Sequence, residues 1–348
     1  MRFADIDFRP GFTVYKNGRG PVWVCPHSGP AMETPTSRDG YSDVVASLCW
    51  LEMGGTLIIS SIPRKQIYGV DFNRESPPRD SALNLWSEFI KDEKRGRLER
   101  YRHTYSWTSF NPGDYRNRMK IYNDFWNTVK KSKEPVVFVH RQFTRVKNFP
   151  SVMDIVTFEG RGVNKKIMEA IVEKANEKYA PFMKHIERDY KDAIKLEHRR
   201  VTDRIREVFS EFSLEKMKVE YKKNILDDMQ NMSKFVNKRV YRKLEKEFSE
   251  RNYMSVLRST LRQKVPPRIT VESFFRGDKA LKSKNPMFIK DRIVMEVEVT
   301  NFLGYWHPKK AAEILMSILR DLVSVETYSE LGVKQKHIIE YVKHEETA

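Results

Sequence analysis

Short apolar runs alternate with longer stretches of helical spacing in the first half of the chain. Apolar runs rich in β-branched residues and bounded by Pro or Gly are typical of buried strands, whereas apolar residues three and four positions apart form one face of a helix. The predicted strands are 21–25, 56–62, 135–140 and 153–158. The predicted helices are 43–53, 82–104 and 113–132. Buried strands separated by helices predict an α/β fold with a mixed, mainly parallel sheet flanked by helices.

The pattern changes in residues 164–264, which contain no glycine and one proline, Pro181. This stretch has 26 lysines and arginines against 17 acidic residues, a local net charge of +9, and its apolar residues recur at helical spacing. It therefore predicts a set of long charged helices. One interpretation is a solvated helical insertion or cap. The other is a basic arm that binds nucleic acid or another partner.

Strand-like sequence returns after Pro266 and Pro267. Residues 268–275 and 292–300 are predicted strands, and residues 311–325 form an amphipathic helical pattern. The chain is therefore predicted to have three parts. Residues 1–163 form the first part of an α/β domain, 164–265 a helical insertion or cap, and 266–348 complete the α/β domain.

The whole chain of 348 residues is strongly basic, with a formal net charge of +17. Such a charge attracts anions: nucleic acid, anionic substrates or an acidic membrane surface. No apolar stretch approaches the ~18 residues that a membrane span needs, and the N-terminus lacks the apolar core of a secretory signal. The two cysteines, Cys25 and Cys49, provide no disulfide framework. These features predict a cytoplasmic protein, and the high content of charged residues is typical of thermophiles. They leave the oligomeric state open.

Two histidines follow or end predicted buried strands. His27 lies in the segment PHSG after strand 21–25, and His140 is the last residue of strand 135–140. Because the carboxyl ends of parallel strands meet at one edge of a sheet, the two side chains can converge. Two histidines and one carboxylate would form a three-ligand catalytic metal site with an open position for water. The alternative is two unrelated histidines with packing roles.

Three acidic residues compete for the third ligand position. Asp39 and Asp43 lie on either side of the start of helix 43–53, so that one could bind metal while the other caps the helix. Glu33, six residues after His27, is the competitor. Helix capping alone would also explain either aspartate, and the sequence does not choose among the three.

Two arginines and a glutamate are candidates for contact with a substrate. Arg74, in the segment VDFNR, and Arg141, next to His140, each carry a planar guanidinium that can bind a carboxylate through two hydrogen bonds. Strand alternation places Glu296 and Glu298 on the same face of strand 292–300. A carboxylate near a metal could act as a general base. Internal ion pairs and a solvent-facing pair of acids are the alternatives.

Several motifs occur in an order that resembles the N-formylglutamate amidohydrolase family, which belongs to the zinc-carboxypeptidase-like metal hydrolases. They are PHSG, SRDGYSDVVASL, GTLIISSIPRKQIYGVDFNRE, PVVFVH, DIVTFEG and VMEVEVTNFLGYW. The resemblance covers roughly residues 20–185 and 266–325. It implies a phosphorylase/hydrolase-like fold and a divalent metal, zinc or another, which activates water to hydrolyse an amide. After His140 the chain has RQFTR, where the family has small or polar residues.

The resemblance also implies a role for each matching residue. His27, His140 and one of Asp39 and Asp43 would bind the metal. Arg74 would hold a carboxylate of a small anionic substrate, and Glu298 would be the base or acid. The leading hypothesis is therefore a metal-dependent amidohydrolase. The alternatives are an aminoacyl-tRNA deacylase, or a non-catalytic module that binds nucleic acid or protein through 164–265.

Overall fold

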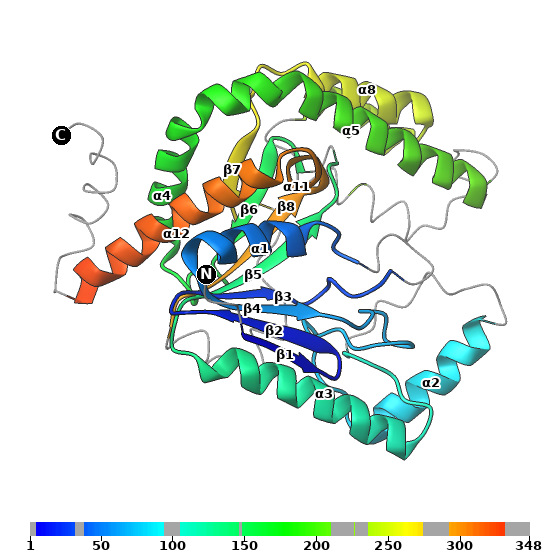
Figure 1. The fold of residues 1–348 in the computed structure, drawn as a ribbon. Helices are drawn as coiled ribbons and strands as arrows, with labels where there is room; N and C mark the ends of the chain where they lie inside the picture. Colours follow the sequence, from blue (N-terminus) through cyan, green and yellow to red (C-terminus); the bar gives the residue numbers. More distant parts are fainter. Residues whose placement is uncertain are drawn as a thin grey trace.

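An eight-stranded mixed sheet runs through the centre of the protein, with the strand order β1-β2-β4-β3-β5-β8-β6-β7 (Figure 1). The computed structural model describes residues 5–31, 38–93, 105–145, 148–209, 226, 236–273 and 292–330. Helices cover the sheet on both faces. The predicted fold class, α/β with a mixed sheet flanked by helices, is confirmed.

The four central strands are parallel. They are β4 (Gly55–Ser60), β3 (Val22–Cys25), β5 (Val136–Gln142) and β8 (Val294–Thr300). Every residue of β3 and β8 is buried, as expected for strands covered on both faces. All four correspond to predicted strands, with ends that differ by up to two residues. Their carboxyl ends meet at one edge of the sheet.

The outer strands make the sheet mixed. The hairpin β1 (Asp5–Arg9) and β2 (Phe12–Asn17), which was not among the predicted elements, pairs antiparallel with β4. On the other side, β6 (Ser151–Val156) is antiparallel to β8 and parallel to β7 (Arg268–Val271). The prediction of strand to residue 158 was wrong, because Phe158 and Glu159 adopt left-handed φ angles of 57° and 61° that turn the chain. The prediction of strand to residue 275 was also too long, since β7 ends at Val271; residues 274 and 275 lie outside the described residues.

Helices pack on both faces of the sheet. On one face lie α1 (Ser42–Met53), α4 (Lys165–Lys178) and α12 (Pro308–Glu330), and α12 contacts both of the others. On the other lies α3 (Pro112–Lys131), with α2 (Arg79–Glu93) beside it. Helix α2 begins three residues before the predicted start, and residues 94–104 of that prediction lie outside the described residues.

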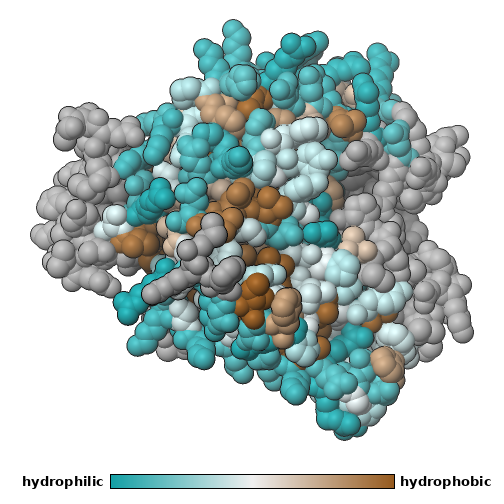
Figure 2. Space-filling view, viewed as in Figure 1, coloured by the Kyte–Doolittle hydropathy of each residue, from teal (hydrophilic) through white to brown (hydrophobic). Residues whose placement is uncertain are grey.

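The basic segment contributes α5 (Ala180–Phe209), α7 (Lys238–Lys246) and α8 (Glu250–Leu261). Tyr190 anchors α5 to the sheet, since its hydroxyl donates to the Ser151 carbonyl at 2.7 Å and its ring stacks on Phe149. The outer surface over α5 and α8 is mostly hydrophilic (Figure 2). The role of this segment as a cap or binding arm stays a prediction. None of the described helices combines the length and apolar character that a bilayer crossing requires.

Candidate metal centre

The carboxyl ends of the central strands bring three predicted ligands together. His27 follows β3 by two residues, His140 lies near the end of β5, and Asp39 precedes α1. Ligand atoms of these three residues lie within 4.8 Å of one another, and all three side chains are buried. The convergence expected from the strand ends is therefore present in the structure.

One oxygen of Asp39 lies between the two histidines. Asp39 Oδ2 is 3.1 Å from His27 Nδ1 and 2.9 Å from His140 Nδ1, and the imidazole centroids are 4.8 Å apart. Both rings thus turn the same nitrogen toward one carboxylate. Two imidazole nitrogens and a carboxylate oxygen are the donors that a catalytic zinc site commonly uses.

The far nitrogens of both rings are held by one short segment that precedes Arg74. Asp71 Oδ1 is 2.9 Å from His27 Nε2, and Asn73 Nδ2 is 2.8 Å from His140 Nε2. The backbone N–H of Asn73 also donates to Asp71 Oδ1. Metal-binding histidines are usually oriented in this way by partners on their second nitrogen.

An unsatisfied atom supports the fit of a metal. Asn73 Oδ1 is buried and has no hydrogen-bond partner among the residues that the structure describes. If the Asn73 amide is rotated by half a turn, this oxygen accepts a hydrogen bond from His140 Nε2–H, and the neutral form of His140 then carries its proton on Nε2 and a lone pair on Nδ1. That tautomer of His140 is the one that could bind a cation, so the residues present fit a metal ion.

Two arginines neutralise the carboxylates. Arg64 Nη1 donates to Asp39 Oδ1 at 3.2 Å and lies 3.3 Å from His27 Nδ1. Arg74 Nε donates to Asp71 Oδ2 at 3.1 Å. About 30% of each arginine side chain is exposed, against 4% or less of the two carboxylates. The guanidinium groups therefore connect the buried centre to solvent.

The charges of the centre depend on one another. Burial alone would raise the pKa of Asp39, but His27, His140 and Arg64 hold it well below its ordinary value. Asp71 also has a lowered pKa, because His27 and the arginines outweigh its burial. Both aspartates are therefore ionised at neutral pH.

The histidines show the complementary effect. Burial and Arg64 act to lower the pKa of His27, but the carboxylates of Asp71 and Asp39 outweigh them and leave it raised. For His140, burial is likewise outweighed, by Glu296 and Asp39. The positively charged forms of both imidazoles are therefore favoured beside Asp39.

Glu298 lies beside the centre on β8, directly opposite His140 in the β5–β8 register. Its side chain is buried, and within the described part of the chain no hydrogen bond reaches its carboxylate. Burial raises the pKa of Glu298 well above its ordinary value, and Glu296 and Asp39 add to this, although His140 opposes it. A buried carboxyl group with a raised pKa can hold or release a proton near neutral pH.

Two predicted residues are placed differently. Asp43 lies in the first turn of α1 and pairs with Arg38 at 3.2 Å, outside the three-residue group. Helix α1 is preceded by Tyr41, which makes no side-chain cap, so neither aspartate caps the helix. Arg141 neighbours His140 but lies with its guanidinium 4.6 Å from the Phe143 ring centroid. The competitor Glu33 lies outside the described residues.

Close backbone contacts position the loops that carry the centre. A Cβ atom on Gly29 would lie 1.8 Å from the Ile62 carbonyl oxygen, and one on Gly69 would lie 1.7 Å from the Pro63 oxygen. Only glycine permits these approaches. The presence of glycine in PHSG therefore has a steric explanation, because a residue without a side chain lets the loop of His27 pack against the loop of Arg64.

Sequence reasoning missed the contribution of Arg64 and assigned no separate role to Asp71. The histidines were found as polar residues at the ends of predicted strands. Arg64 meets this criterion because it lies after the carboxyl end of β4, and Asp71 follows an apolar residue in the same connection. A search for polar residues after every predicted strand would have included Arg64.

Comparisons with known proteins place the chain near two solved structures. No family model and no curated protein sequence matches the chain. It is similar to the crystal structure of an N-formylglutamate amidohydrolase from Ralstonia eutropha JMP134, with 11% identity, a TM-score of 0.46, and coverage of 93% of this chain and 99% of that one. It is also similar to a gene product from Agrobacterium tumefaciens, with 11% identity, a TM-score of 0.42, and coverage of 93% and 96%. At such values neither structure bears on what this chain binds or does.

Proposed function

We propose that the chain is a metal-dependent hydrolase that cleaves an amide or related acyl bond in a small carboxylate-bearing substrate. One observation carries the proposal: the buried group His27, Asp39 and His140, in which both imidazoles turn Nδ1 toward one carboxylate oxygen. Asp71 and Asn73 hold the opposite nitrogens. Ligand histidines whose second nitrogen is held by a polar partner are typical of metal sites.

The three side chains would hold zinc or another divalent cation. A bound zinc ion lowers the pKa of water to about 7 and polarises the carbonyl group of a substrate. Three protein ligands leave a further coordination position open, which separates catalytic from structural zinc sites. The donor set therefore favours catalysis over a purely structural role.

Glu298 is the proposed proton carrier. Its carboxyl group is buried beside His140, and burial raises its pKa, which makes its ionised form a stronger proton acceptor. In hydrolysis the ionised carboxylate would take a proton from the attacking water, and the resulting carboxylic acid would return it to the leaving nitrogen. A glutamate in this role must titrate, so Glu298→Gln should keep the metal and lose at least about 10²-fold in kcat.

The arginines are proposed to bind the anionic part of the substrate. Arg74 and Arg64 reach from the buried carboxylates to solvent, and each has a planar donor face suited to a carboxylate. Arg141, on the ring of Phe143, adds positive charge near the same edge of the sheet. Such contacts orient the scissile bond, and orientation supplies much of the rate enhancement of a hydrolase.

Metal analysis tests the proposal directly. Purified protein would be loaded with zinc, desalted and analysed by mass spectrometry, alongside His27→Ala, His140→Ala and Asp43→Ala. We expect about one equivalent of zinc in the unaltered protein and in Asp43→Ala, and little in either histidine variant. Asp43→Ala is the matched control, because it removes a nearby carboxylate that lies outside the group.

Activity is tested on the same proteins. A panel of N-formyl and N-acetyl amino acids would be scored for release of the free amine. Amine release that needs both histidines and is abolished by a chelator supports the assignment. Equal zinc content in all four proteins would refute this site.

A further inference from the structure

A cluster of exposed aromatic rings borders the metal centre. Tyr41, Tyr305 and Trp306 are 38%, 49% and 67% exposed. The ring centroids of Tyr41 and Tyr305 are 4.5 Å apart, and those of Tyr305 and Trp306 are 4.9 Å apart. Tyr41 is two residues from Asp39. Grouped aromatic rings with this exposure mark an interaction surface.

The backbone at Tyr41 directs the ring to this cluster. Tyr41 has a left-handed φ of 70°, a conformation that a bulky residue rarely adopts. Its ring packs on Tyr305 of α11 (Asn301–Trp306), which directly follows β8. The surface is thus built from the two segments that lead out of the metal centre, the loop of Asp39 and the end of β8.

The aromatic cluster continues onto helix α5. His307, which follows Trp306, packs against Phe182 in the first turn of α5 at 5.4 Å. His185, on the next turn, and Asp189, one turn further, are both close enough to act electrostatically on His307. The exposed rings therefore adjoin the side of the α5 start that carries Phe182 and His185.

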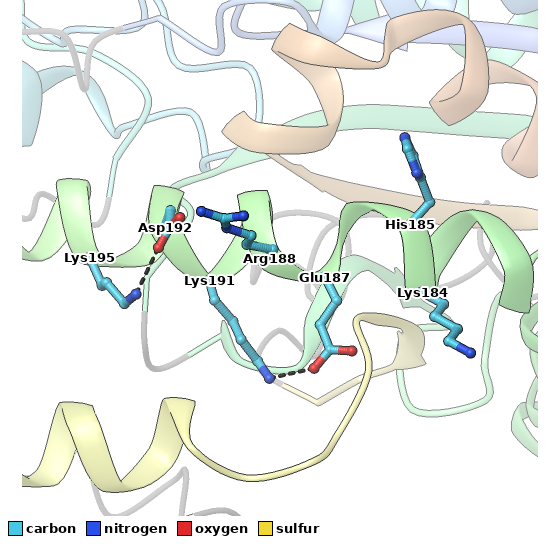
Figure 3. Close-up of a pocket in the computed structure, with 7 residues that line it drawn as sticks. All are labelled: Lys184, His185, Glu187, Arg188, Lys191, Asp192 and Lys195. Carbon is cyan, nitrogen blue, oxygen red and sulfur yellow. Dashed lines mark hydrogen bonds and ion pairs between the residues drawn. The ribbon is translucent and has the colours of Figure 1, made fainter.

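Helix α5 presents a row of cations along a neighbouring side, and Figure 3 shows its lysines pointing away from His185. Lys184, Arg188, Lys191 and Lys195 are spaced by four, three and four residues, which places them on one face over about 16 Å. They line an open groove of about 600 Å³ (Figure 3). A row of this length suits an extended anion better than a single small one.

Two of these cations are already paired and two are not. Lys191 pairs with Glu187 at 2.5 Å, and Lys195 pairs with Asp192 at 2.7 Å, as the dashed lines in Figure 3 show. Among the described residues, neither Lys184 nor Arg188 has an acidic partner within 4.0 Å, and both are exposed. These two side chains are the ones available to an incoming phosphate.

We propose that the aromatic cluster and the α5 cations together bind single-stranded nucleic acid that crosses the start of α5, with bases stacked on Tyr41, Tyr305 and Trp306 and the phosphate backbone along the cations. Stacking rings beside a cationic track match the two chemical components of a single strand. The net charge of +17 adds long-range attraction. This binding activity goes beyond the proposed hydrolysis and needs no metal.

Anisotropy of a fluorescein-labelled oligouridylate, measured with the full chain after removal of metal, tests the proposal. We expect binding that weakens steeply with salt. Arg188→Glu should weaken it about tenfold or more, with a smaller salt slope. The control is Arg116→Glu on α3, an exposed position across the sheet with the same change of charge, which should leave binding within about twofold.

Stacking is tested separately. Trp306→Ala should weaken binding roughly five- to 150-fold, whereas Trp306→Phe keeps a ring and should restore most of it. Absence of binding by the unaltered protein at low salt, or equal losses in the two charge reversals, would overturn the proposal. Binding to phosphatidylserine vesicles without binding to the oligonucleotide would also overturn it. Zinc content and amide hydrolysis of the same variants are measured apart, so that failure of either proposal is visible on its own.

Discussion

The metal centre and the outer face of α5 both carry several charged side chains, but they differ in burial and in the number of partners per charge. Asp39 is 3% exposed and faces three positive or proton-donating groups, His27, His140 and Arg64. On α5, Asp192 pairs with Lys195, and about half of each side chain is exposed.

This difference determines what each charge can do. Removal of one member of a buried charge cluster leaves its partners uncompensated and costs several kcal/mol, whereas an exposed ion pair contributes about 0–1 kcal/mol. In the centre, individual residues therefore carry the function. On α5, only the sum of the charges over the whole row can matter.

The largest effect is expected from Asp39→Ala. In the metal-free protein this change leaves Arg64 and two buried histidines without their shared carboxylate, so we expect a loss of about 3–5 kcal/mol in the free energy of unfolding. Urea denaturation followed by circular dichroism measures it, and zinc binding should also be lost. A loss below about 1 kcal/mol would mean that the buried cluster is no more coupled than a surface pair.

Glu298→Gln should reveal a buried acid through the pH dependence of stability. The folded-state pKa of Glu298 is raised mainly by burial. The folded state thus retains a proton that the unfolded state has lost, and stability decreases as pH rises from the unfolded pKa through the folded one. Glutamine does not titrate, so the metal-free variant should be more stable than the unaltered protein at pH 8 and no more stable at pH 4. If the free energy of unfolding changes with pH in the same way in both proteins, the pKa of Glu298 is not raised.

Arg64→Ala should strengthen metal binding. Arg64 Nη1 lies against Asp39 Oδ1 and His27 Nδ1, where it competes for the ligand atoms and repels a cation. We expect zinc affinity, measured by competition with a chelating dye, to rise about tenfold, equivalent to about 1.4 kcal/mol. Arg74→Ala is the control, because Arg74 pairs with Asp71, whose carboxylate contacts the far nitrogen of His27. An equal gain in both variants would indicate a general effect of lost positive charge.

The sequence contained enough to predict the central strands and the convergence of the two histidines. Continuous apolar runs identify β3 and most of β5 because these strands are buried on both faces, and β8 is identified by apolar residues that alternate with Glu296 and Glu298. The hairpin β1–β2 was missed because β1 is mostly exposed and β2 buries only alternate residues, Phe12 and Val14, so that neither forms a continuous apolar run. Apolar content also gives no strand direction, so the antiparallel position of β6 could not be read from its sequence.

The choice between Asp39 and Asp43 lies beyond such patterns. The two residues differ by one turn of chain at the start of α1, and the course of the preceding loop decides which one reaches the histidines. The same holds for Arg64, whose approach depends on the close contact of Gly29 with Ile62. Contacts between loops distant in sequence leave no periodic signal, so only the three-dimensional arrangement resolves them.

The smallest effect is expected from Asp192→Ala, the exposed counterpart of Asp39→Ala. Its pair with Lys195 joins residues three apart on a helix, with both side chains about half exposed. We expect the free energy of unfolding to change by less than about 0.5 kcal/mol in urea denaturation. Because the change frees Lys195, it should also slightly strengthen binding of the oligouridylate. A loss above about 2 kcal/mol would show that charges on α5 are coupled as strongly as those of the buried centre, and the contrast between the two regions would fail.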